Sequence, residues 1–180
     1  IRQFLSEYRK KPYILCEYTH SMGNSNGAMH KYTEYAYEEP LFQGGFIWDY
    51  LDQSIRTKNR FGGMRYGYGG DFDDRPADYE FSGNGIVFAD GEETPKLQEV
   101  KYNYQNIVCD VTEDGVLIHN RHMFLNTSEY DCVVTLEREG KVIDRAIMET
   151  DVPPLSHDAY HLPFDKPECP GEYCITVSFL

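Results

Sequence analysis

The sequence contains no apolar run close to the roughly 18 residues that a membrane-spanning helix needs. It is also poor in positive charge, because 17 Lys and Arg residues face 30 Asp and Glu residues, for a formal net charge of −13. This excess of negative charge repels nucleic acid and anionic membrane surfaces, so we expect neither as a partner. A neutral substrate such as a sugar is compatible with it.

Cysteine pairs of the C-x-x-C type are also absent, and the five cysteines make an odd count. This pattern disfavours a zinc ribbon or a disulfide scaffold and favours reduced, mostly buried thiols. Phosphate-binding loops, dinucleotide-binding loops and the G-x-S-x-G motif are missing. The N-terminal stretch IRQFLSEYRK is not a signal peptide, since charges interrupt it. It has no initiator Met, and we expect a piece excised from a longer protein.

The 180 residues, 41% of them hydrophobic, suffice for one domain or two small ones with a real core. In the first part, apolar runs predict short buried strands at residues 13–16 and 45–48. Between them, Met29, Tyr32 and Ala36 have the spacing of an amphipathic helix, which a following proline ends. A strand, a helix and a second strand predict a βαβ unit in a parallel sheet covered by helices.

Residues 51–81 form a long stretch rich in Gly, Asp, Arg and Tyr, and we expect a functional loop there. A helix is expected after it, with Thr94 as its cap and Pro95 at its first position. Beyond residue 100 the pattern changes to short β-rich runs, with tight turns expected at Asp114-Gly115 and Glu139-Gly140. The runs are IVCDVT, GVLIHN, YDCVVTLER, VIDRAIMET, YHLPF and EYCITVSF. They predict an antiparallel, immunoglobulin-like β-sandwich.

Glu17 follows the first predicted strand, in the stretch YILCEYTHSMGN. The carboxyl end of a parallel strand is where (β/α) barrels and open α/β sheets carry out chemistry. A carboxylate there can be a nucleophile, a general base or a metal ligand, or simply a strand end that reaches water. His20, three residues later, is a candidate to bind substrate or to cap the loop.

Trp48, the single tryptophan, ends the second predicted strand. It is a candidate for packing or for a platform under a sugar ring. Asp49 and Asp52 follow it as carboxylates near the site or as solvated ends. The stretch DFDDRPADYE fails as a calcium loop, because the fifth, sixth and twelfth positions lack the required residues. Four histidines of the second part are interpreted as structural, namely His119, His122, His157 and His161.

Three segments together resemble the large bacterial β-galactosidases of glycoside hydrolase family 2. They are ILCEYTHSMGNSNG, LFQGGFIWDYLDQS and YGGDFDDRPADYEFSGNGIVFADGEETPKLQEVKY, in this order. The resemblance covers about Lys11 to Tyr104, and the β-rich remainder fits the domain that follows the barrel in that family. It implies that residues 1–104 are the C-terminal part of a catalytic TIM barrel and residues 105–180 an immunoglobulin-like sandwich.

The resemblance also implies roles for individual residues. Glu17 would be the nucleophile that forms a galactosyl-enzyme ester, His20 would hold galactosyl hydroxyls, and Trp48 would be an apolar wall under the sugar. The backbone carbonyl of Phe81 and the side-chain oxygen of Asn84 would bind sodium, as hard oxygen donors suit a hard cation.

The family's acid/base glutamate, its magnesium ligands and a further sodium ligand would lie upstream of this sequence. We therefore expect part of a retaining β-galactosidase that is inactive by itself, acts in its parent on β-galactosides, and belongs to a cytoplasmic homo-oligomer. The alternative is a stand-alone, non-catalytic module that binds carbohydrate or organises an assembly.

Overall fold

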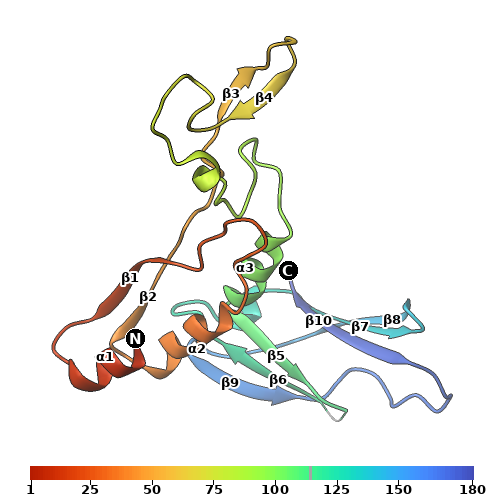
Figure 1. Ribbon diagram of the computed structural model, residues 1–180. Coiled ribbons are helices and arrows are strands. Elements are labelled where there is room, and N and C mark those ends of the chain that lie inside the picture. The colour runs from red at the N-terminus through yellow and green to blue at the C-terminus, as the bar shows by residue number, and fades with distance from the viewer. Residues whose placement is uncertain (114) are drawn as a thin grey trace. The chain divides into compact units, whose positions relative to one another are not determined.

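The computed structural model describes residues 1–113 and 115–180. It divides into two compact units, Ile1–Tyr104 and Gln105–Leu180 (Figure 1). No helix among these residues is long and apolar enough to cross a membrane.

The first unit is built around two parallel strands, β1 (Tyr13–Tyr18) and β2 (Phe42–Ile47). Helix α2 (His30–Glu38) connects them, as the predicted βαβ unit requires, and helix α1 (Arg2–Glu7) precedes them. The helix predicted from the spacing of Met29, Tyr32 and Ala36 is therefore confirmed. Strand β1 extends beyond the predicted residues 13–16, and β2 begins and ends earlier than the predicted residues 45–48. Both strands are less buried than predicted.

Helices cover one face of this strand pair. Leu5 of α1, Tyr35 of α2 and Phe42 of β2 form one buried cluster. A second cluster joins Tyr18 and Met29 to helix α3 (Lys96–Asn103). On the strands, Ile14 and Phe46 remain 57% and 67% exposed. The strands are thus half-exposed because only one of their faces is packed within the described residues.

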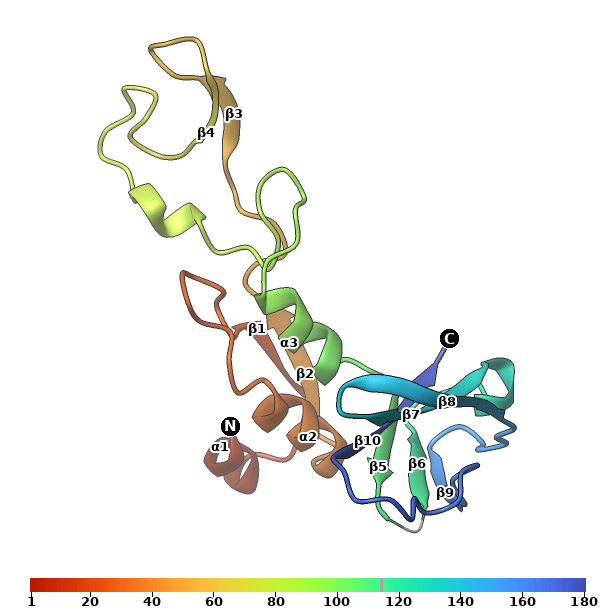
Figure 2. The same ribbon diagram turned by 90° about the vertical axis from the view of Figure 1, so that its right-hand side faces the viewer.

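Residues 51–81 contain regular structure rather than a single loop. Strands β3 (Ile55–Lys58) and β4 (Met64–Gly67) pair as an antiparallel hairpin, followed by a 3₁₀ helix, η1 (Tyr79–Ser82). The hairpin projects away from β1 and β2 in both views (Figures 1 and 2). The side chain of Asn59 closes its turn by accepting hydrogen bonds from two backbone N–H groups. Sequence analysis missed the hairpin because its strands are short and polar.

Helix α3 begins at Lys96 with Pro95 as its N-cap, one residue later than predicted, and the Thr94 side chain bonds the first residue of the helix. The Thr94 hydroxyl oxygen accepts a hydrogen bond from Lys96 N at 3.2 Å and donates one to Ile86 O at 2.7 Å. The cap therefore also holds the chain segment that enters the helix.

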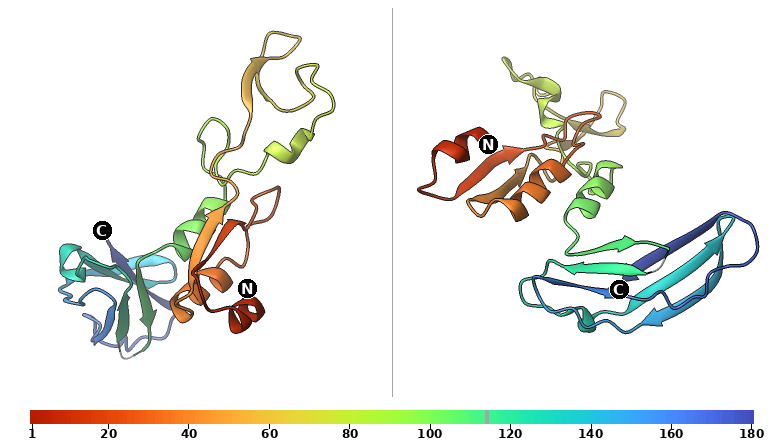
Figure 3. Two further views of the ribbon diagram at one scale, coloured as in Figure 1. Left: turned by 90° about the vertical axis from the view of Figure 1, so that its left-hand side faces the viewer. Right: turned by 90° about the horizontal axis from the view of Figure 1, so that it is seen from below.

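The second unit contains two antiparallel three-stranded sheets (Figure 3). In one sheet, β10 and β8 flank β7; in the other, β5 and β9 flank β6. The strands are β5 (Ile107–Val111), β6 (Val116–Asn120), β7 (Cys132–Arg138), β8 (Lys141–Met148), β9 (Ser156–Tyr160) and β10 (Tyr173–Phe179). A short 3₁₀ helix, η2 (Thr127–Glu129), precedes β7. The run YHLPF was interpreted wrongly, because β9 ends at its first residue.

Side chains from both sheets meet in one buried cluster around Val116, Ile118 and Val152, as expected for two packed layers. The turn at Glu139-Gly140 joins β7 to β8, with Glu139 and Gly140 both at positive φ. The other predicted turn includes Asp114, which lies outside the described residues.

All five cysteines are free, but three of them are exposed, so the prediction of mostly buried thiols was wrong.

Candidate functional site

Glu17 lies near the carboxyl end of β1, where a register shift redirects its side chain. Leu15 pairs with Gly45, whereas Tyr18 pairs with Ile47, so β1 uses one residue more than β2 over this interval. Leu15 and Tyr18 consequently both join the core under the helices. An extra residue in one strand turns the following side chains relative to the sheet. The Glu17 side chain remains outside the core and is 41% exposed.

His20 holds the Glu17 carboxylate. Its Nε2 lies 2.8 Å from Glu17 Oε2, and since an ionised carboxylate only accepts hydrogen bonds, the imidazole is the donor. The loop behind this pair is also fixed, because Ser25 Oγ donates a hydrogen bond to His20 O at 2.7 Å. The two residues that the sequence singled out in this stretch therefore form one contact.

The end of β2 is joined to the same region through its backbone. Trp48 N donates to Tyr18 O at 3.2 Å, and Ser21 N donates to Trp48 O at 2.8 Å. The ammonium group of Lys96 donates to Ser21 O at 2.6 Å, which links this loop to α3. Trp48 is thereby held beside the carboxyl end of β1, as the βαβ geometry predicts.

The segment that carries Asn84 is fastened to the residues after Trp48. Asp49 N donates to Asn84 O at 2.6 Å, and Gly85 N donates to the Asp52 carboxylate at 2.7 Å. Gly85 is packed so closely that an added Cβ would lie 2.2 Å from Asp52 N and 2.4 Å from Val87 O. Asp49 and Asp52 therefore hold the segment of Asn84 and Gly85 in place, Asp49 through its backbone N–H and Asp52 through its carboxylate.

A cavity of about 330 Å³ lies between these segments. Its lining includes three of the predicted site residues, Trp48, Phe81 and Asn84, together with Gln53, Gly69, Asp78, Tyr79 and Ser82. Glu17 and His20 are not part of this lining. The predicted residues thus form two sets: the Glu17–His20 pair, and the three residues Trp48, Phe81 and Asn84 that line the cavity.

Asn84 has the surroundings of a cation ligand. The residue is 1% exposed, and its Nδ2 donates to the backbone carbonyl of Phe81 at 2.9 Å. Its Oδ1 is buried and has no hydrogen-bond partner among the described residues. A buried oxygen without a partner is a feature of hard-cation sites. Here Nδ2, and not Oδ1, faces the Phe81 carbonyl, so the two oxygens would face one ion only with the amide turned over, which exchanges Oδ1 and Nδ2.

Sequence analysis missed Ser82, whose hydroxyl oxygen is buried and also lacks a partner in the described part of the chain. Its only signal was its place between Phe81 and Asn84. In the acidic stretch after β4, the Asp71 carboxylate accepts a hydrogen bond from Tyr68 N and pairs with Arg65, and both contacts lower the pKa of Asp71.

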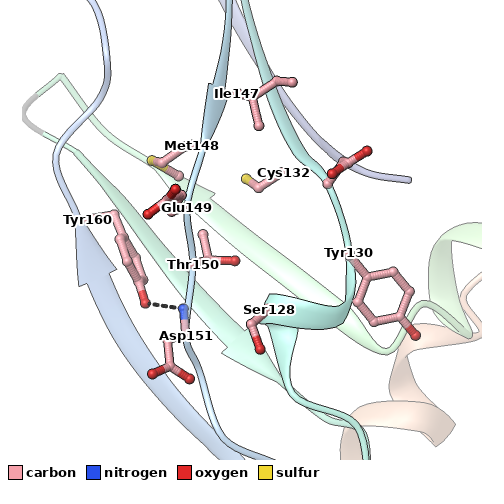
Figure 4. Close-up of a pocket in the computed structure, with 10 residues that line it drawn as sticks. Ser128, Tyr130, Cys132, Ile147, Met148, Glu149, Thr150, Asp151 and Tyr160 are labelled. Carbon is pink, nitrogen blue, oxygen red and sulfur yellow. Dashed lines mark hydrogen bonds between the residues drawn. The ribbon is translucent and has the colours of Figure 1, made fainter.

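A larger cavity, of about 720 Å³, lies in the second unit (Figure 4). Glu149 and Asp151 point to one side of their segment, whereas Thr150 points to the other. Within residues 1–113 and 115–180, no group of three or more His, Cys, Asp or Glu side chains could hold a metal ion. His119 contacts Asp110 at 3.2 Å and His122 contacts the Tyr130 hydroxyl at 3.1 Å. These contacts agree with the structural interpretation of the two histidines.

Comparison with known proteins defines the class first. Residues 2–109 match the family model "Glycosyl hydrolases family 2, TIM barrel domain". The chain therefore belongs to glycosyl hydrolase family 2, and its first unit is part of a TIM barrel domain. Residues 116–180 match "Beta-galactosidase, domain 4", so a β domain follows the partial barrel.

Individual relatives carry one name. The chain is 49% identical to a "Beta-galactosidase" of Halalkalibacterium halodurans, over 97% of this chain and 18% of the relative. It is 47% identical to a "Beta-galactosidase" of Clostridium acetobutylicum, over 99% of this chain and 20% of the relative. The chain thus spans about a fifth of the length of these relatives. Family membership supports the glycosidase hypothesis over the stand-alone module.

Proposed function

We propose that this chain is part of a retaining β-galactosidase that hydrolyses terminal β-D-galactosides through a covalent galactosyl-enzyme intermediate. The observation that supports this most is the 2.8 Å contact between Glu17 and His20 near the end of a parallel strand, in a chain of this family. It leaves a carboxylate at the edge of the sheet where barrel enzymes bind substrate.

In this proposal Glu17 is the nucleophile. His20 holds Oε2, so Oε1 is the oxygen that attacks the anomeric carbon while the bond from that carbon to the leaving oxygen breaks. The leaving oxygen takes a proton from an acid, and the product is an ester between Glu17 and the galactosyl group. The acid, which has lost its proton in this step, then takes a proton from a water molecule. That water hydrolyses the ester and restores the Glu17 carboxylate.

The second carboxyl of a retaining glycosidase stands roughly 5 Å from the nucleophile. We assign this acid/base residue, and the magnesium ligands, to parts of the longer protein outside this chain. General acid catalysis contributes about 10²–10⁴-fold, so we expect the 180-residue chain by itself not to hydrolyse galactosides.

His20 and Trp48 would contact the sugar. His20 would bind hydroxyl groups of the galactosyl ring, and Trp48 would lie under that ring with its aromatic face. With the Asn84 amide turned over relative to its contact with Phe81, the Phe81 carbonyl and Asn84 Oδ1 would hold a sodium ion, whose charge would help to position the substrate. Asn84 is fixed for this purpose by its backbone contact to Asp49 at 2.6 Å.

The two packed sheets of the second unit support an immunoglobulin-like sandwich as the finer description of that domain. A cytoplasmic homo-oligomer that binds neither nucleic acid nor membrane is the form that we propose for the parent. The negative charge of the chain, −13, supports the exclusion of these two partners.

The test is to trap the intermediate in the full-length protein. A 2-deoxy-2-fluoro galactoside with an activated leaving group slows ester turnover, because the fluorine destabilises the oxocarbenium-like transition state. Peptide mapping should then find the label on Glu17. A label on another carboxylate, with Glu17 unmodified, would contradict the assignment.

A further inference from the structure

Two histidines of the second unit lie side by side on neighbouring strands of one sheet. His119 of β6 and His157 of β9 are paired directly across the antiparallel ladder. Their ring centroids are 5.5 Å apart, and the ring planes are inclined by 36°. Directly opposed side chains on one face of a sheet lie close enough to hold a common partner. The sheet itself therefore places the two imidazoles together.

These imidazoles lie on the outer face of the sheet. Val116 and Ile118 of β6 belong to the buried cluster between the two sheets, and successive residues of a strand point to opposite faces. His119 consequently points away from this core, and 36% of its side chain is exposed. His157, its cross-strand partner, is also exposed. A solute can reach both rings without disturbing the core.

A carboxylate holds one of the two rings. Asp110 Oδ2 of β5 lies 3.2 Å from His119 Nε2. In metal-binding histidines such a carboxylate accepts the N–H of one ring nitrogen and leaves the other, here Nδ1, to bind the ion. Within residues 1–113 and 115–180, the His157 ring contacts the His119 ring and makes no hydrogen bond. Each ring thus has a nitrogen that can serve as a ligand.

The chemistry of this face favours a divalent transition-metal ion. Strands β5, β6 and β9 contain the carboxylates Asp110 and Asp158 but no Lys or Arg, so they attract cations and repel anions. Imidazole is a ligand of zinc, copper and nickel ions. Bonds of about 2.0–2.1 Å to one tetrahedral ion place two imidazole centroids roughly 5 Å apart. The observed 5.5 Å is close to this separation.

We propose that His119 and His157 together bind one divalent transition-metal ion of the Zn²⁺ class. Asp110 orients the His119 ring, and water completes the coordination of the ion. Two imidazoles are fewer than the side chains of a closed structural site, so the bound ion exchanges with solution. This site is independent of the proposed hydrolysis, and it gives a role to two histidines that the sequence pattern had indicated to be structural.

The experiment follows the acylation of individual histidines by diethyl pyrocarbonate in the full-length protein. The reagent acylates an imidazole nitrogen that carries no proton, and a bound metal ion blocks that nitrogen. ZnCl₂ is titrated at neutral pH in a buffer that does not coordinate metals. Peptide mass spectrometry then gives the zinc concentration that half-protects each histidine. MgCl₂ is the control salt, because Mg²⁺ prefers oxygen ligands.

We expect zinc to protect His119 and His157 with one common midpoint, and magnesium to protect neither. His157→Gln should raise the midpoint of His119 by at least about tenfold, and His119→Gln should do the same to His157. Asp110→Asn should raise both midpoints about tenfold, since an orienting carboxylate contributes on this scale. His161→Gln is the matched control on an exposed histidine close to β9, and it should leave both midpoints within about twofold.

The rise in melting temperature on addition of zinc is a second readout that needs no acylation. It should be smaller in His119→Gln and in His157→Gln than in His161→Gln, because only the first two variants lose a ligand of the ion.

Three results would overturn the inference. Protection of neither histidine at about 1 mM zinc would show that the pair does not bind the ion. A midpoint of His119 that His157→Gln leaves unchanged would show that the two rings do not share an ion. Equal protection of His161 would show that zinc acts on exposed histidines in general.

Discussion

The two units of the chain bury their apolar side chains in different ways. The Gln105–Leu180 unit joins side chains from both of its sheets in one cluster around Ile118, which is fully buried. The Ile1–Tyr104 unit has two separate clusters under its helices, and Ile14 and Phe46 on its strands remain exposed. One unit thus packs both sheets against each other, whereas the other packs one face of a strand pair.

Unpartnered polar atoms follow the same division. Five of the six described residues with such buried atoms lie in the first unit, namely Thr19, Asn26, Arg65, Ser82 and Asn84, and the sixth is Thr150. Buried polar groups without partners mark ligand sites or missing contacts. The comparison shows that, among the described residues, buried polar atoms that need a partner are concentrated in the first unit.

The largest effect should come from Glu17→Gln in the full-length protein. Replacing the nucleophile by a poor one should lower kcat by on the order of 10⁴-fold. The fold should survive, because the Glu17 side chain is 41% exposed. Steady-state assays with a nitrophenyl galactoside measure the loss, with Glu34→Gln on the exposed side of α2 as the control. Full activity in Glu17→Gln would show that Glu17 is not the nucleophile.

Ile118→Ala tests the self-contained core of the second unit. The side chain is fully buried, and truncation of such a residue costs about 2–5 kcal/mol of unfolding free energy. Ile143→Ala is the matched control, because Ile143 is 54% exposed on β8. Denaturant unfolding followed by circular dichroism gives both values. Equal losses at the two positions would show that the cluster is not the core of this unit.

Gly85→Ala tests the close packing that fixes Asn84. An added Cβ would lie 2.2 Å from Asp52 N, so backbone must shift, at a cost of about 1–3 kcal/mol. We expect a lower melting temperature and weaker sodium binding. Gly91→Ala is an instructive control, because Gly91 has open space but a positive φ of 87°. It should lower stability through backbone strain without weakening sodium binding.

Alkaline pH should affect the core of the second unit by a smaller amount. Burial raises the pKa of Cys132 to about 11 from 9.0, and the residue is 1% exposed. A thiol that stays protonated in the folded state stabilises it fully below about pH 9, and this contribution is lost as pH rises toward 11. We expect a loss of roughly 1–2 kcal/mol over this interval.

The measurement is denaturant unfolding at several pH values between 8 and 11. Cys132→Ala should reduce the alkaline slope of the profile without abolishing it, because burial also raises the pKa of Cys109 to about 11. Cys169→Ala should not, because Cys169 is exposed. An unchanged slope in Cys132→Ala would assign the alkaline effect to other groups.

Local patterns explain which elements were predictable. The helical spacing of Met29, Tyr32 and Ala36 identified α2, because a helix must place its apolar residues on one face to pack. The alternation in β7 and β10 identified that sheet for the same reason, with a period of two. The hairpin after β2 escaped because Ile55–Lys58 and Met64–Gly67 have little apolar content, and its turn depends on the Asn59 side chain.

The sequence by itself determined the family, the order of elements and the residue types of the site, since motifs and periodicity are local properties. Only the tertiary structure decided how these residues are used. The extra residue between Leu15 and Tyr18 is defined by pairing with β2, and it keeps Glu17 out of the core. The positions of Asn84 and Ser82 are held by backbone hydrogen bonds from distant residues, Asp49 and Gln53. Register and burial arise from contacts between segments far apart in the chain, so no local pattern encodes them.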